Sequence, residues 1–188
     1  MSQVWPWLLI ILLLAVAFGP LYWMRPSPRE HRQARMRARA RQRGLIVNLA
    51  GIVNRRPAAE DQVTAGGRIK SPEVQVAAYR LQDQEVREGV PLWCIQRGGG
   101  DFPGPLVGWQ WEPPSWRRET WPAGYWDRVA ALLADLPEDV LQVEAQPWQV
   151  SCYWRERAND ENAEAQVDRI ADCLQGLLAL QIDHARAR

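Results

Sequence analysis

The stretch that decides the fold is "VLQVEAQPWQVSCYWRE", residues 140–156. Gln146-Pro147 marks a turn between two runs that read as β-strands. In the later strand every second residue shares one face: Trp148, Val150, Cys152 and Trp154. The residues between them share the opposite face: Gln149, Ser151, Tyr153 and Arg155. We expect Trp148 and Trp154 to pack in the core, because phenylalanine is too scarce in this chain to supply its aromatic packing.

The rest of residues 44–188 extends this pattern. Four more runs are typical of strands: 45–53, 74–82, 91–96 and 106–111. A helix is predicted in "PAGYWDRVAALLADLPED", with Trp126 on its inner stripe, and another in "NDENAEAQVDRIADCLQGLLALQ". The stripe of the last helix is Ala163, Val167, Ile170, Leu174, Leu177 and Leu178. The strands outnumber the helices, which come late, so we expect an α+β fold with a mainly antiparallel sheet and two helices.

The amino-terminal segment predicts a membrane anchor over residues 1–24. "VWPWLLIILLLAVAFGPLYWM", residues 4–24, has no charged side chain. As a helix it would span roughly 31 Å, close to the hydrocarbon thickness of a bilayer. Aromatic residues at its two ends would lie at the membrane interfaces: Trp5, Trp7, Tyr22 and Trp23. The alternative, a cleaved signal peptide, is disfavoured because no Lys or Arg precedes the apolar run.

Residues 25–43 form a basic segment, predicted to be a helical stalk. They contain eight arginines and a single acid, Glu30, whereas the remaining chain has 15 basic and 21 acidic side chains. By the positive-inside rule we expect an inner-membrane protein with its amino terminus outside and residues 25–188 in the cytoplasm. Arginines fall on nearly every face of the predicted helix, so we expect it to lie outside the core.

Three roles for the stalk are left open. It can serve only as a topology signal, or it can contact anionic lipid headgroups. The candidates for lipid contact are Arg25, Arg29, Arg32, Arg35, Arg39 and Arg43. The third role, nucleic-acid binding, is disfavoured because an acidic domain follows and would repel phosphates.

The proline-rich "EPPSWRRETWPAG", residues 112–124, is the candidate partner-binding loop. It presents Trp116, Arg117, Arg118 and Trp121, and Trp and Arg are enriched at interaction hot spots. The alternatives are that this patch faces the membrane, or that both rings fold back to cap the sheet.

The chain shows no motif for catalysis or metal binding. Cys94, Cys152 and Cys173 form no CxxC pair, and His31 and His184 lie near opposite ends. We therefore predict no catalytic residues, no cofactor and no metal site, with three buried, reduced thiols. An enzyme that relies on Asp, Glu or Cys alone remains an alternative.

The predicted anchor runs into "RPSPREHRQARMRARARQRGL", and "DQVTAGG", Asp61–Gly67, stands further along the chain. With the anchor, these stretches of the first 70 residues resemble the YajC family, small accessory subunits of the bacterial preprotein translocase. The second stretch approaches that family's Asp-x-Val-x-Thr-x-Gly-Gly, with Thr64 one position too near Val63. The resemblance implies a small anchored protein that accompanies a larger inner-membrane complex. It implies no functional residues.

These patterns favour a non-catalytic protein that binds or positions a partner complex at the bilayer. The first alternative is a domain with a small-ligand or enzyme pocket beside the Trp-bearing sheet. The second is a nucleic-acid tether.

Overall fold

The computed structural model describes residues 5, 7, 9–14, 27–53, 73–85, 90, 92–98, 102–112 and 124–186. The chain divides into two compact units, Met1–Ala34 and Arg35–Arg188. Each unit is described by itself.

The predicted transmembrane helix is not found. Residues 5, 7 and 9–14 are helical with exposed side chains, and the rest of the 4–24 span, including Tyr22 and Trp23, lies outside the described residues. A membrane helix needs about 20 apolar residues, and in the described ranges no helix is long and apolar enough to cross a bilayer. The predicted fold class is therefore wrong in including an amino-terminal transmembrane helix. The inner-membrane location and the topology were deduced from the same helix, and they are corrected with it.

Helix α2 (Pro28–Gln42) begins with a capping box that the sequence analysis did not identify. The Ser27 amide donates to Glu30 Oε2 over 2.6 Å, and the Glu30 amide donates to Ser27 Oγ over 3.3 Å. Pro28 stands at the first helical position, where its missing N–H costs nothing. The hydrogen bonds from Ser27 lower the pKa of Glu30.

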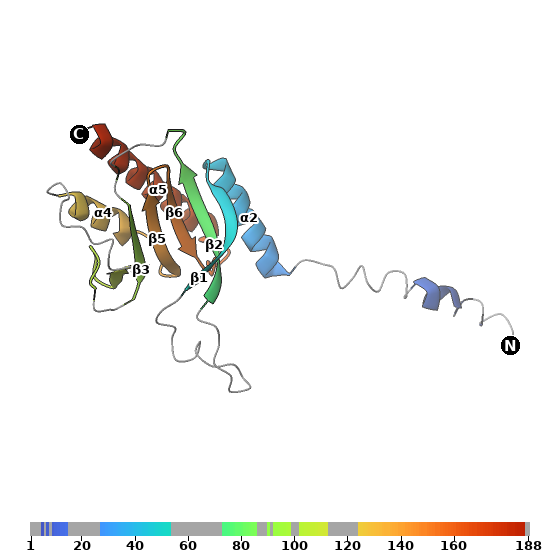
Figure 1. Ribbon diagram of the computed structural model, residues 1–188. Coiled ribbons are helices and arrows are strands. Elements are labelled where there is room, and N and C mark those ends of the chain that lie inside the picture. Colours follow the sequence, from blue (N-terminus) through green and yellow to red (C-terminus); the bar gives the residue numbers. More distant parts are fainter. Residues whose placement is uncertain are drawn as a thin grey trace. The chain divides into compact units, whose positions relative to one another are not determined.

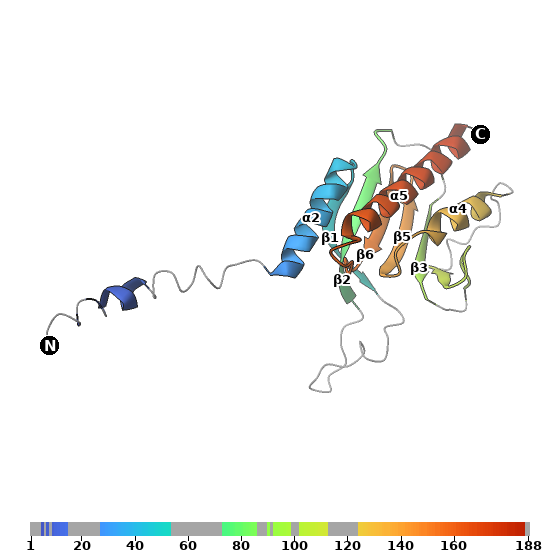
Figure 2. The same ribbon diagram turned by 180° about the vertical axis from the view of Figure 1, so that it is seen from behind.

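The second unit is built on a six-stranded sheet with the order β1-β2-β6-β5-β3-β4 and antiparallel neighbours throughout. The strands are β1 (Ile46–Val53), β2 (Glu73–Gln82), β3 (Trp93–Arg97), β4 (Trp109–Trp111), β5 (Val140–Gln146) and β6 (Gln149–Trp154). Each overlaps a run that the sequence predicted as a strand. Figures 1 and 2 show α4 (Tyr125–Ala134) and α5 (Ala163–Arg186) lying across one face of this sheet.

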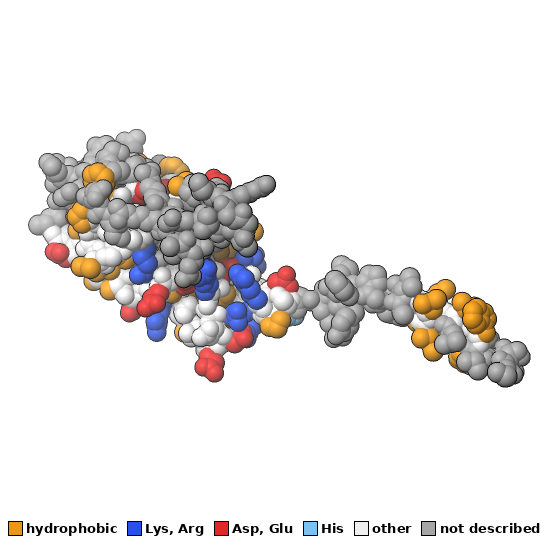
Figure 3. Space-filling view, turned by 90° about the horizontal axis from the view of Figure 1, so that it is seen from below, with side chains coloured by type: hydrophobic (Ala, Val, Ile, Leu, Met, Phe, Trp, Pro, Cys, Tyr) orange, Lys and Arg blue, Asp and Glu red, His pale blue; other side chains and the backbone are white. Residues whose placement is uncertain are grey.

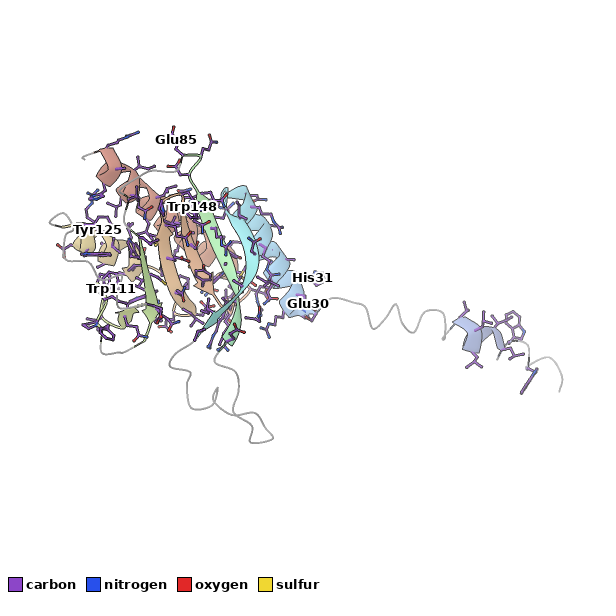
Figure 4. The ribbon with its side chains drawn as sticks, viewed as in Figure 1. Glu30, His31, Glu85, Trp111, Tyr125 and Trp148 are labelled. Atoms are coloured by element: carbon purple, nitrogen blue, oxygen red, sulfur yellow. The ribbon has the colours of Figure 1, made fainter. Side chains whose placement is uncertain are left out.

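The main core lies between that face and the helices. The stripe predicted for α5 is confirmed, with Leu178 at its margin, partly buried. Trp154 is fully buried and Trp126 packs against the core, as expected. The prediction for Trp148 is wrong, because this side chain is 42% exposed. Alternation places it on the core face, but it stands in the β5–β6 turn, beyond the last paired residues (Figure 4).

From Arg35 onward, α2 is part of this core. Met36 and Ala40 are fully buried, and Leu45 beyond the helix is 2% exposed. The expectation that the arginine helix lies outside the core is therefore wrong. Met36 and Ala40 are four residues apart and therefore lie on one face of the helix. This apolar stripe is too narrow to stand out in an arginine-rich sequence, but it is enough to pack the helix against the core.

Strand β1 curls over the second face of the sheet, the face away from α4 and α5 (Figure 1). The Gln96 side-chain amide of β3 donates to the Val53 carbonyl of β1 over 2.8 Å, although three strands separate β1 from β3 in the sheet order. Beneath the curl lies a smaller apolar cluster of Ile52, Val76, Ala78 and Tyr153. The second face is therefore partly enclosed by the sheet's own edge.

Candidate functional site

The predicted partner loop lies outside the described residues. Trp116, Arg117, Arg118 and Trp121 all fall between β4 and α4, in residues 113–123. Their role stays a prediction.

Of the arginines predicted to contact lipid, Arg25 lies outside the described residues, and Arg29 and Arg32 belong to the first unit. The other three, Arg35, Arg39 and Arg43, meet carboxylates at the start of α5 and just before it. Arg39 makes a bidentate pair with Asp168 (3.0 and 2.9 Å), and Arg35 Nη2 lies 2.6 Å from Asp160 Oδ1. Arg43 contacts both Asp168 (3.4 Å) and Asp172. These pairs tie α2 to α5.

Arg37 makes the most buried of the pairs. Its Nε and Nη2 donate to the two carboxylate oxygens of Glu156 over 2.9 and 2.6 Å, and the Tyr79 hydroxyl donates to Glu156 Oε1 over 3.1 Å. Glu156 is 3% exposed and has a positive φ of 52°. Burial and the neighbouring Glu156 charge raise the pKa of Tyr79. The contacts of Glu156 fix α2 against the end of β6.

The described tryptophans of the Trp-rich stretch are packing residues. Trp109 and Trp111 are 3% and 6% exposed. Trp126 meets the edges of Trp93, Trp111 and Tyr125 at ring-centroid distances of 5.7, 4.6 and 4.9 Å. The Trp93 indole donates to the Tyr125 hydroxyl over 3.0 Å, and Trp111 and Tyr125 lie at the same side of the sheet (Figure 4). This aromatic cluster joins α4 to β3 and β4.

The three cysteines are buried in positions that suppress their nucleophilicity. Burial raises the pKa of Cys173 to about 12 and also raises the pKa values of the Cys94 and Cys152 thiols. A thiol reacts through its thiolate, so the raised pKa values lower the reactivity of these groups at neutral pH in the folded chain.

Strand β1 is an edge strand with unusual exposure of apolar side chains. Ile46, Leu49 and Val53 are 42%, 69% and 48% exposed. Within the described ranges no strand pairs with the outer side of β1. Residues 45–53 contain no charge and no proline, the usual devices that keep an edge from pairing. This edge is suited to accept another strand.

The second face of the sheet is polar, yet partly buried. Gln149, Ser151 and Tyr153 of β6 are 8%, 0% and 7% exposed. The Tyr153 hydroxyl donates to Glu144 over 2.7 Å, and Gln146 also donates to Glu144. Burial raises the pKa of Tyr153 to about 12, Glu144 adds to the rise, and Arg80 opposes it. A cavity of about 360 Å³ opens on this face. Its wall is formed by Ala50, Gly51, Ile52, Val53, Arg80, Glu112, Gln142 and Tyr153.

Sequence reasoning missed both the ion pairs and the cavity. Arg35, Arg39 and Arg43 recur every four residues, as do Asp160, Glu164, Asp168 and Asp172, and this matching period was a readable signal. The cavity left no comparable signal, because it depends on the curl of β1. Comparison of the chain with protein-family models, with curated proteins and with solved structures found no match. The YajC resemblance therefore stays a prediction.

Proposed function

We propose that this chain is a non-catalytic binding protein whose second unit takes up an extended segment of a partner protein along β1. The observation that carries the proposal is the eight-residue, uncharged edge strand with three large apolar side chains in solvent. A row of unpaired backbone N–H and C=O groups is complementary to another strand. The apolar side chains favour a partner strand that is itself apolar.

The arrangement of charge supports a protein partner over a nucleic acid. Figure 3 shows acidic and basic side chains interspersed on the face seen there. Arg35, Arg37, Arg39 and Arg43 already pair with carboxylates, which leaves less of their charge for phosphates.

Site-specific photocrosslinking tests the proposal. A photoreactive residue replaces Leu49 in the full chain within cells, and a matched probe replaces Val107, which is 99% exposed beside β4 at the other edge. We expect a discrete adduct with another protein from position 49, and its loss when Ile46→Lys is added. Equal adducts from both positions, or none from position 49, would overturn the proposal. An adduct of twice the chain's mass would instead identify a second copy.

The Trp116–Trp121 segment is a separate candidate surface. In the sequence it follows β4, the strand at the opposite edge of the sheet from β1, and it lies outside the described residues. If it also contacts the partner, Trp116→Ala with Trp121→Ala should weaken the position-49 adduct while the urea midpoint stays unchanged.

A further inference from the structure

The cavity on the second face shares Val53 with the exposed edge of β1, but it does not include Leu49, the most exposed apolar residue of that strand. Its wall takes residues from β1, β2, β5 and β6, together with Glu112 after β4. Ala50 and Ile52 line it, whereas Leu49 alternates with them and shares its face with Ala77 of the main core. Leu49 can therefore be changed to test pairing along β1 without changing a residue that lines the cavity.

Arg80 brings a cation to this wall, where its guanidinium also interacts with the Tyr153 side chain. Its Nε is buried without a hydrogen-bond partner. Leaving a buried donor unpaired costs free energy, more so on a charged group. Ser151 is the register partner of Arg80 across β2 and β6, so the two share a face. Its Oγ is also buried without a partner. Of these two buried groups, only Arg80 belongs to a residue that lines the cavity, and Ser151 lies behind the wall.

The residues that line the cavity together with Arg80 restrict the kind of ligand that can bind there. A planar carboxylate matches the fork of a guanidinium, and Gln142 brings an amide to the same wall. Ala50, Ile52 and Val53 make another part of the wall apolar. Glu112 also lines the cavity, and its negative charge opposes a second anionic group on the ligand. The volume of about 360 Å³ lies within the range of small-molecule sites.

We propose that the cavity binds a small monocarboxylate with a short aliphatic body, with its carboxylate on Arg80 and its hydrocarbon against Ala50, Ile52 and Val53. The Gln142 amide donates to the same carboxylate. Glu144 stays with Tyr153 and Gln146, so it takes no part.

Calorimetric titration of the full chain with hexanoate tests this site. Hexanamide replaces the charge with a neutral group, and adipate adds a second carboxylate. We expect hexanoate to bind, and both analogues to bind at least about tenfold more weakly. Arg80→Gln should weaken hexanoate about tenfold or more, and Gln142→Ala by a smaller factor. Arg128→Gln, at an arginine on α4 that is 65% exposed, is the matched control and should change nothing.

The variants at Leu49 and Arg80 test the β1 proposal and the cavity proposal separately. Leu49→Lys should leave hexanoate binding intact, because its side chain points away from the cavity. No binding of hexanoate at millimolar concentration, or binding that Arg80→Gln leaves unchanged while its urea midpoint matches wild type, would overturn the site. If Arg80→Gln fails to fold, Gln142→Ala and the hexanamide comparison still decide the matter.

Discussion

Glu156 joins three parts of the second unit through one carboxylate. It follows β6, accepts both donors of the Arg37 fork from α2, and accepts the Tyr79 hydroxyl from β2. Its left-handed backbone, at φ 52°, costs about 1 kcal/mol for a residue that carries a Cβ. The hydrogen bonds hold that conformation, so the strain and the ion pair belong to one local arrangement.

Arg37→Ala should lower the free energy of unfolding by about 2 kcal/mol, because it leaves the buried Glu156 carboxylate without its cation. Arg35→Ala is the matched control on the same helix. Its pair with Asp160 is more than half exposed, so the change should stay within about 0.5 kcal/mol. Urea denaturation of both variants measures the difference. Equal losses of unfolding free energy in the two variants would contradict the claim that the buried Arg37–Glu156 pair stabilises the fold more than the exposed Arg35–Asp160 pair.

The buried thiols predict a loss of stability at alkaline pH. The pKa of Cys173 is about 12 in the folded chain, above the ordinary value of 9.0, and the Cys94 and Cys152 pKa values are also raised. Above pH 9 the unfolded thiol releases its proton while the folded thiol keeps it. Stability is therefore complete below pH 9 and falls as pH rises toward 12, by up to about 1.4 kcal/mol per pH unit for each thiol.

Urea midpoints at pH 8, 9 and 10 check this. Cys173→Ala should reduce the slope above pH 9, because one titrating thiol has been removed from the unfolded state. An unchanged slope would show that other groups cause the alkaline loss.

At the scale of elements, the strand positions could be predicted because alternation and turn residues are local signals. The packing of α2 could not. Met36 and Ala40 give too narrow an apolar stripe to stand out among arginines, and the partners of those arginines lie 119 to 129 residues away. The prediction that Trp148 is buried was wrong for a different reason. Its alternation was right, but the turn it occupies leaves its ring outside the packed layer.

The ion pairs between α2 and α5 predict a salt-dependent effect of charge reversal. Asp168→Lys places a cation between Arg39 and Arg43, so the urea midpoint should fall at low salt and partly recover in 1 M NaCl, where screening shortens the range of the repulsion to about 3 Å. Asp183→Lys, on the same helix but beside Arg128, should have little effect. A loss from Asp168→Lys that salt leaves unchanged would point to packing instead of charge.

At the scale of the whole second unit, the sheet has two different faces and an open edge. One face is a core under α4 and α5, and the other is a polar surface partly enclosed by β1. The curl of β1 could not be predicted, because the contact that records it joins residues 43 apart on strands that are not neighbours. Strand β1 thus contributes to the wall of the cavity on the second face of the sheet, and its outer edge exposes apolar side chains.

The most direct measurement of the central claim is residue-resolved amide hydrogen exchange on the isolated chain at neutral pH. If β1 is an unoccupied edge, amides that point outward should exchange quickly at alternate positions of Ile46–Val53, while those of the central strand β6 stay protected. Uniform slow exchange along β1, as strong as in β6, would show that the edge is already paired. That result would contradict its assignment as the partner-binding surface.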